Sequence, residues 1–453
     1  MASQVYSVGT AGRSLSAATG LVPQMLAVFE AAGFAEMIAP GDTVAIKLHC
    51  GEWNNTGYLR PVYARALADH IKALGGRPFV CDTTTLTYAR TASRATGLDI
   101  LITAERNGYT SATLGCPFIV ADGFNGTDDL RVDLPEGYIL KEAYIAKAIA
   151  VADVLIALTH FKGHPLGVIG GSIKNLGIGA QSKRGKHNVH MGGHPKYGLG
   201  AATDFHPERC KGRAGCERWE ICENVCPYGL FHVTEHSIEW DREHCTSCLA
   251  HFGANTWCGV CDFPELTFKA SNAAMADACL GAVKAVGREK VGFINMAIDI
   301  SPACDCVGHS DMPIVPNLGV FASKDPVALD KASVDKAAQA PGMPGSAAED
   351  YGAAERGAHK FTAASAVHFE GLSEEIQIET GTINGLGSKE YELVDVKPLA
   401  DTHLFVFPDP RSLRAKFLPL YRKEDPFPHE RYEGQGFLRA EEVDLDRVAT
   451  MAE

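Results

Sequence analysis

Short apolar runs alternate with amphipathic segments along most of this 453-residue chain. The run at 44–48 is typical of a buried strand, and the apolar residues that follow Pro61 recur at helical spacing up to the double glycine at 75–76. A second buried strand is predicted at 79–82. This order predicts a βαβ unit, in which a helix connects two parallel strands.

The alternation continues further along the chain. A helix is predicted at 141–150 and a strand at 154–158, and later a helix at 273–286 precedes a strand at 292–300. Strands that alternate with helices indicate an α/β fold, in which a mostly parallel sheet is covered by helices. In such sheets ligands bind beyond the carboxyl ends of the strands, so the loops at those ends are the first candidates for a site.

The loop that follows 154–158 is rich in glycine and basic residues. No Asp or Glu occurs from 154 to 203, although the whole chain has 42 basic and 55 acidic residues and a net charge of −13. Glycines let the backbone approach a ligand closely, and lysines supply positive charge for a phosphate or carboxylate. The pattern predicts an anion-binding active-site loop; a solvated glycine-rich loop is the alternative.

The candidate functional residues follow from this interpretation. The basic and polar candidates of the loop are His160, Lys162, His164, Lys174, Asn175 and Lys186, and the glycines expected to approach a cofactor or ligand are Gly170, Gly171, Gly177 and Gly179. We expect the lysines to bind the anion and one of His160 and His164 to supply a proton. Cys304 and Cys306 follow the strand at 292–300 and are further candidates for proton transfer or substrate contact.

Eight of the 14 cysteines fall in one short stretch of the chain. They are Cys210, Cys216, Cys222, Cys226, Cys245, Cys248, Cys258 and Cys261. Cys226 is followed directly by Pro227, as is the last cysteine of the bacterial ferredoxin motif. Since each 4Fe–4S cluster takes four thiolates, the stretch predicts two such clusters.

The ligands can be assigned by analogy with ferredoxins. The analogy gives Cys210, Cys216, Cys222 and Cys261 to one cluster, and Cys226, Cys245, Cys248 and Cys258 to the other. His251 stands where a third cysteine of the second motif is expected, so it is a candidate substitute ligand. A β-hairpin is predicted between the two cysteine groups. Structural zinc sites and disulfides are the alternatives to iron.

The bulk composition argues against several other classes of protein. A net charge of −13 argues against general affinity for nucleic acid or for an anionic membrane surface. No apolar run approaches the ~20 residues of a transmembrane helix, and the N-terminus lacks a signal-peptide pattern. We therefore expect a cytoplasmic location, which would keep the thiols reduced. No Gly-x-Gly-x-x-Gly follows the first strand, so no flavin or nicotinamide fingerprint is present.

Five short motifs follow one another along the chain. They are HFKGH at 160–164, GGSIKNLG at 170–177, FIN at 293–295 with Cys304-Asp-Cys306, SKDPVALD at 323–330 and GLGSKEYEL at 385–393. Together they resemble the family called domain of unknown function 362, in its ferredoxin-containing form. The resemblance implies an α/β domain with a two-cluster ferredoxin module inserted between its halves.

Four parts are expected from the resemblance and the composition. They are the first half of the α/β domain at 1–204, the iron–sulfur insertion at 205–268, the second half of the domain at 269–395 and a C-terminal extension at 396–453. The extension is predicted to pack along the surface or across the interface of a homodimer.

Three functions are compatible with these features. The first, which we favour, is an oxidoreductase that receives electrons from an external ferredoxin and passes them through two 4Fe–4S clusters to a small anionic substrate in the basic, histidine-rich loop. The second is an electron-transfer or maturation protein without its own substrate. The third is a non-redox isomerase or lyase whose clusters are structural.

Overall fold

The computed structural model describes residues 2–9, 19–86, 93–191, 204–245, 258–262, 265–367, 369–397 and 440–449. The chain separates into two compact units, 1–400 and 401–453. In the second unit the described part consists of a short 3-10 helix and α16 (Leu445–Ala449). The predicted packing of the C-terminal extension falls mostly outside the described residues.

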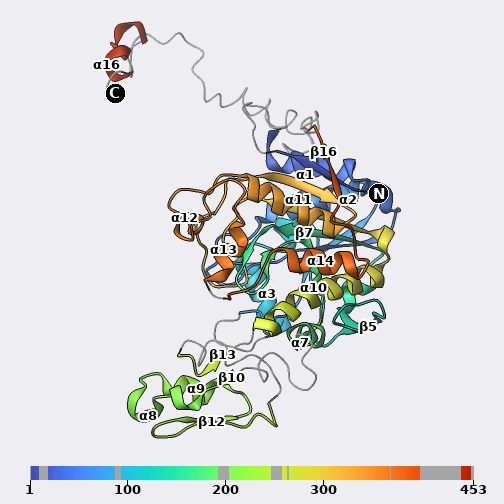
Figure 1. Cartoon of the computed structure of the whole chain (residues 1–453). Helices are drawn as coiled ribbons and strands as arrows, with labels where there is room; N and C mark the ends of the chain where they lie inside the picture. The colour runs from blue at the N-terminus through green and yellow to red at the C-terminus, as the bar shows by residue number, and fades with distance from the viewer. Residues whose placement is uncertain are drawn as a thin grey trace, which may run out of the picture. The chain divides into compact units, whose positions relative to one another are not determined.

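One eight-stranded sheet forms the centre of the first unit (Figure 1). In spatial order its strands are β16 (Tyr391–Asp395), β1 (Ser3–Val8), β15 (Gly319–Ser323), β14 (Val291–Ala297), β7 (Val154–His160), β2 (Thr43–Lys47), β3 (Arg77–Asp82) and β4 (Phe118–Val120). The strands from β14 to β4 are parallel to one another, and β15 is antiparallel to both of its neighbours. The predicted α/β fold with a mostly parallel sheet is confirmed.

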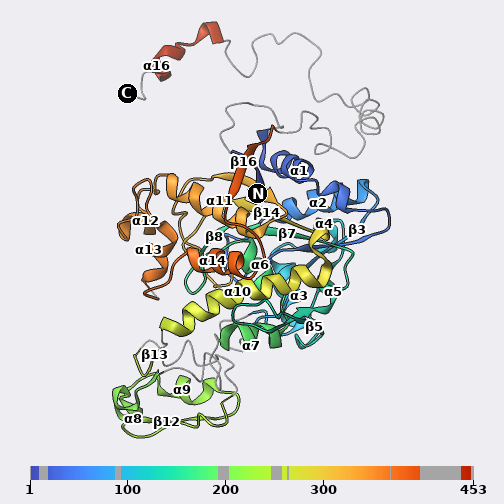
Figure 2. The same ribbon diagram turned by 45° about the vertical axis from the view of Figure 1, so that its right-hand side comes forward.

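Helices cover this sheet on both sides (Figures 1 and 2). α1 (Leu21–Ala31) and α2 (Pro61–Ala73) contact each other and the sheet. A second group contains α6 (Ser172–Gly177), α10 (Glu265–Val286), α11 (Pro326–Gln339) and α14 (Glu375–Ile383). The alternate residues Leu155 and Ala157 of β7 share a core with apolar residues of α6 and α10, as the two-residue period of a strand requires.

Most of the predicted elements are confirmed, but the prediction of a helix at 141–150 is wrong. Residues Glu142–Ala146 form strand β6, which pairs with β5 (Asp129–Asp133), and only Lys147–Ala150 is helical. Ala143 and Ile145 are buried whereas Glu142 and Tyr144 are half-exposed, so the first four residues alternate with the two-residue period of a strand. Its Ala, Lys and Glu content favoured a helix, and pairing with β5 overrode that preference.

The cysteine-rich segment forms a small structure of its own. Its first and last described strands, β10 (Asp204–Phe205) and β13 (Cys261–Asp262), pair antiparallel, so the segment enters and leaves at one place. The predicted hairpin is confirmed as β11 (Phe231–Val233) and β12 (Ile238–Trp240), whose apolar side chains pack with Val260. None of the described helices in the chain is both long enough and apolar enough to cross a membrane.

Candidate active site

A cavity of about 190 Å³ lies beyond the carboxyl ends of the parallel strands. Lys47 ends β2, Asp82 ends β3 and His160 ends β7, and all three line the cavity. Lys174 of α6 and Cys304, in the loop after β14, complete the wall from the other side. The site is therefore where an open parallel sheet binds its ligands.

Lys47 and Asp82 form a buried ion pair between two neighbouring strands. The Nζ atom of Lys47 lies 3.0 Å from Oδ1 of Asp82 and donates a 3.1 Å hydrogen bond to Asn175 Oδ1. Burial would raise the pKa of Asp82, but its polar surroundings, Lys47 first among them, outweigh burial and lower it far below its usual range. This pair was not among the candidates predicted from the sequence, where a lysine inside a buried strand was the available signal.

Asp305 holds two of the predicted residues in the wall. Its carboxylate lies 2.9 Å from Nδ1 of His160 and 2.9 Å from Nζ of Lys162, and all three side chains are buried. The Nε2 atom of His160 lies 2.8 Å from the carbonyl oxygen of Ile298, so an acceptor faces each of its two ring nitrogens. Burial would lower the pKa of Lys162, but Asp305 outweighs burial and raises it.

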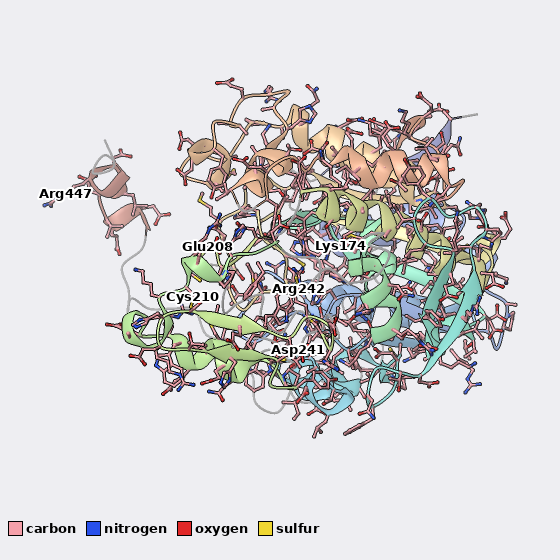
Figure 3. All side chains as sticks on the ribbon, turned by 60° about the horizontal axis from the view of Figure 1, so that its bottom comes forward. Lys174, Glu208, Cys210, Asp241, Arg242 and Arg447 are labelled. Atoms are coloured by element: carbon pink, nitrogen blue, oxygen red, sulfur yellow. The ribbon has the colours of Figure 1, made fainter. Side chains whose placement is uncertain are left out.

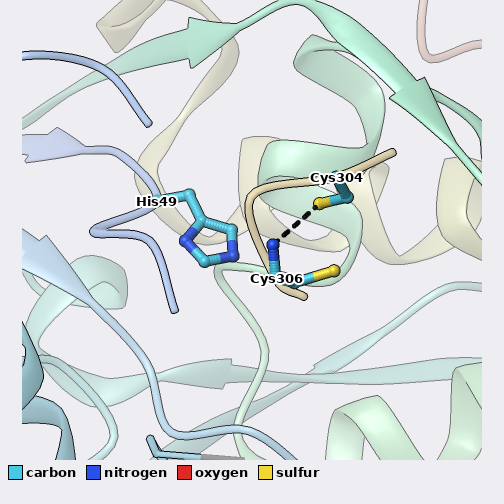
Figure 4. A group of neighbouring side chains, drawn as sticks. All are labelled: His49, Cys304 and Cys306. Atoms are coloured by element: carbon cyan, nitrogen blue, oxygen red, sulfur yellow. Dashed lines mark hydrogen bonds between the residues drawn. The ribbon is translucent and has the colours of Figure 1, made fainter. Parts of the chain in front are cut away.

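Cys304 and Cys306 lie side by side next to His49 (Figure 4). The backbone N–H of Cys306 donates to Sγ of Cys304 at 3.4 Å. The hydrogen bond with the Cys306 thiol lowers the pKa of Cys304 well below its usual value, and the same bond raises the pKa of Cys306.

His164 faces these cysteines as a neutral ring. Burial and the nearby Lys174 lower the pKa of His164 well below its usual value. Its Nδ1 atom accepts the backbone N–H of Gly167 at 2.7 Å, so its hydrogen is carried by Nε2. Nε2 lies 3.6 Å from Sγ of Cys306 and can donate to that sulfur.

Helix α6 supplies the predicted Lys174 and Asn175. The side-chain oxygen of Asn175 accepts a hydrogen bond from Lys47, and its Nδ2 atom donates one to the hydroxyl of Thr159 at 3.0 Å. The side-chain ammonium of Lys174, which is labelled in Figure 3, forms no hydrogen bond or ion pair with any residue in the described part of the chain. It is half-buried in the cavity wall, so its ammonium is available to a bound anion.

Asp330 fixes the beginning of this helix. Its two carboxylate oxygens accept the backbone N–H groups of Ser172 at 2.8 Å and Ile173 at 2.9 Å, and Asn295 donates to it at 2.8 Å. Burial raises the pKa of Asp330 to about 6. The glycine-rich, FIN and SKDPVALD motifs thus meet at one buried carboxylate, which positions α6 and does not touch the cavity.

The predicted glycines have two different environments. Gly170, Gly171 and Gly179 line the cavity, and Gly177 does not. A Cβ on Gly177 would lie 2.2 Å from the carbonyl oxygen of Met275, whereas one on Gly170 would meet nothing closer than 3.5 Å. Gly177 therefore allows α6 to pack closely on α10, and Gly170 faces space that a ligand can use.

Lys186 of α7 (Lys183–Met191) reaches the cavity through a buried side chain. Its Nζ atom donates a 2.8 Å hydrogen bond to the hydroxyl of Thr83. Burial lowers its pKa to about 7, although Asp122 acts in the opposite direction. A lysine with this pKa exchanges a proton near neutral pH, which suits general acid–base chemistry.

Four cysteines of the insertion lie within electrostatic reach of one another. Burial and the charges of Cys258, Cys216 and Cys210 raise the pKa of Cys222 to about 11, and burial with Cys258 and Cys216 raises that of Cys210. Cys258, which the ferredoxin analogy assigned to the second cluster, is thus near the first three cysteines. None of the described cysteines forms a disulfide. Cys248 and His251 lie outside the described residues.

Comparisons with known proteins point to one family. The family model described as "Domain of unknown function (DUF362)" matches residues 44–335, more than half of the chain. No curated protein matches the sequence significantly. A solved structure, the lactate racemase apoprotein from Thermoanaerobacterium thermosaccharolyticum, is 14% identical with a TM-score of 0.36, and the match covers 76% of this chain and 59% of that chain. A likeness this weak bears on neither fold nor reaction.

Proposed function

This chain belongs to the family described as Domain of unknown function (DUF362), and we propose that it is an iron–sulfur oxidoreductase that passes electrons through two 4Fe–4S clusters to a small anionic substrate in the cavity. The observation that carries the proposal is the grouping of cysteines in this segment, where Cys210, Cys222 and Cys226 pack against one small apolar core. Cys216 and Cys258 also lie close enough to raise the pKa of Cys210 and Cys222. The ammonium of Lys174, which lines the cavity and can bind an anion, supports an anionic substrate.

The cysteines of the insertion fit the proposed clusters. Cys210, Cys216, Cys222 and Cys258 are assigned to one cluster because their charges already influence one another. The remaining cysteines of the stretch, Cys226, Cys245, Cys248 and Cys261, are assigned to the other. When bound, such clusters accept and release single electrons. An external ferredoxin is the proposed source of those electrons.

The charged side chains of the cavity wall favour binding of an anion at Lys174. Asp82 neutralises Lys47, and Asp305 neutralises Lys162, so these lysines have their partners within the wall. Lys174 has no such partner in the described part of the chain and binds the carboxylate or phosphate of the substrate. The cavity volume of about 190 Å³ restricts the substrate to a small molecule.

Reduction of an organic molecule consumes protons as well as electrons, and Lys186 is the proposed donor. Its pKa of about 7 gives a substantial fraction of ammonium at neutral pH. His160 suits this role less well than the sequence suggested, because both of its nitrogens are committed to Asp305 and Ile298. His160 instead holds the loop that carries Cys304 and Cys306.

The test is reoxidation of the reduced protein. Anaerobic protein is reduced, freed of excess dithionite and mixed with small electrophilic carboxylates and phosphates, while the cluster absorbance is followed. We expect one class of compound to reoxidise it. Lys174→Ala should raise the half-saturating concentration by about 10- to 100-fold, since a hydrogen bond to a charged group contributes about 1.5–3 kcal/mol.

Two variants control this experiment. Lys174→Arg keeps the charge and should retain part of the affinity, and Lys336→Ala removes an exposed lysine outside the cavity and should change nothing. Reduced protein that stays reduced with every compound contradicts the proposal. If a partner protein alone reoxidises it and Lys174→Ala has no effect, the chain is an electron carrier without its own substrate.

A further inference from the structure

We propose that His49, Cys304 and Cys306 form a binding site for a single thiophilic divalent metal ion of the zinc class, separate from the iron–sulfur insertion. One ligand atom from each of these residues lies within 4.8 Å of the other two. Figure 4 shows the imidazole of His49 beside the loop that carries the two cysteines, and all three residues line the cavity. The inference does not depend on the proposed redox function.

The ligands are brought together by two loops that are tied to each other. His49 follows β2, and both cysteines lie in the loop after β14. The backbone N–H of Glu52 donates to the carbonyl of Asp305 at 2.9 Å and so connects the two loops directly. Contacts that hold ligand-bearing segments in place before the metal arrives are what a preorganised site requires.

The side chain of Asp305 anchors the loop that carries the two cysteines. Its carboxylate is fixed by His160 and Lys162, each at 2.9 Å. This fixes the short segment from Cys304 to Cys306. Within it, the backbone N–H of Cys306 donates a hydrogen bond to the sulfur of Cys304. His164 places its Nε2 atom 3.6 Å from the sulfur of Cys306 and can support that ligand from outside the coordination sphere.

The types of ligand select the class of metal. Two sulfurs and one imidazole nitrogen suit zinc and related thiophilic ions, whereas magnesium and calcium require oxygen ligands. Three protein ligands leave a fourth position open, and all three line the cavity, so a substrate group or water can occupy it.

A second group, His49 with Cys50 and Asp82, has similar spacing but suits a metal less well. Asp82 is already engaged by Lys47 at 3.0 Å and by the backbone N–H groups of Cys50 and Thr83 at 3.1 and 2.9 Å. Cys50 is fully buried and does not line the cavity. His49, Cys304 and Cys306 are therefore the preferred ligands.

The test uses the full-length protein and zinc. After dialysis against Zn²⁺ under anaerobic conditions, we expect about one tightly bound zinc per chain in addition to iron, with zinc K-edge absorption that shows two sulfurs at ~2.3 Å and nitrogen at ~2.0–2.1 Å. Cys304→Ser and Cys306→Ser should each weaken zinc binding by about 100-fold or more, because losing even an outer-shell partner costs about 10–100-fold. Iron content should not change.

Two variants make the result specific to this site. Cys50→Ser tests the competing group, and Cys116→Ser removes a buried cysteine outside the cavity; both should bind zinc normally. The proposal is overturned if no zinc binds. It is also overturned if the spectrum shows four sulfurs, because that would place zinc in the cysteine-rich insertion. The third contrary result is a Cys50→Ser variant that loses zinc while Cys304→Ser keeps it. The wild-type spectrum decides the ligand set even if a variant fails to fold. Iron content and cluster signals are measured separately, so failure here leaves the redox proposal standing.

Discussion

Lys47 and Lys162 each face a buried carboxylate, whereas Lys174 does not. A charge removed from water is costly unless it is paired, so the two paired lysines maintain the wall and the third can serve a ligand. The sequence identified Lys162 and Lys174 as candidates but could not separate their roles. The difference depends on Asp305, which is distant in sequence and reaches the site only through the fold.

Lys186 should control the pH dependence of substrate reduction. Burial lowers its pKa from 10.5 to about 7, so the ammonium that donates a proton predominates below pH 7 and is lost above it. We expect kcat to fall as pH rises through about 7, measured with reduced clusters. Lys186→Arg, which stays charged, should abolish this fall while lowering kcat. The same fall in the arginine variant would assign the titration to another group.

Asp330 should be required for stability and not for chemistry. In Asp330→Asn an amide NH₂ replaces one acceptor oxygen and faces a backbone N–H of α6 or the amide of Asn295. We expect a loss of about 1–3 kcal/mol in the free energy of unfolding, the cost of an unsatisfied buried donor, measured by urea denaturation. Asp350→Asn, at an exposed carboxylate, should have no measurable effect.

Helix α6 shows what an element requires beyond its own sequence. The glycines in and just before this helix suggested a ligand-binding loop, and Gly170, the last residue of strand β9 (Val168–Gly170), fits that interpretation because it lines the cavity. Gly177 is required for a different reason, the close approach of Met275 on α10. No pattern near Gly177 could reveal this contact. The strand Glu142–Ala146 was missed in a similar way, because its pairing partner, rather than its composition, determines its conformation.

A pair of alanine substitutions should separate these two kinds of glycine. Gly177→Ala forces a Cβ to within 2.2 Å of backbone and should destabilise the protein by about 1–3 kcal/mol, the usual cost of overpacking. Gly170→Ala meets only ordinary contacts and should leave the thermal midpoint unchanged while raising KM for the substrate. Equal stability of the two variants would show that α6 does not need this close packing.

The whole first unit combines a sheet that the sequence could predict with details that it could not. The alternation of strands and helices predicted the parallel sheet and the position of the site at its carboxyl edge. The antiparallel strand β15 and the pairing of β16 with β1 depend on contacts between distant segments, which periodicity does not reveal. The cysteine stretch identified candidate ligands in the sequence, but spacing alone gave no information on how these cysteines are arranged in space.

Substitutions in the insertion should remove iron in a stepwise manner. Cys222→Ser deletes one thiol of the group with Cys210, Cys216 and Cys258 and should lower the iron content from about eight to about four per chain, because each four-iron cluster needs its full ligand set. Cys116→Ser should retain about eight. Loss of all the iron from Cys222→Ser would show that the two clusters do not assemble independently.

Whether the insertion carries redox-active clusters can be decided by anaerobic iron and sulfide analysis, combined with electron paramagnetic resonance before and after dithionite. We predict about eight iron and eight sulfide ions per chain, the content of two 4Fe–4S clusters, and a signal from interacting clusters that appears on reduction. Zinc in the insertion, with neither iron nor a signal after dithionite, would contradict the account.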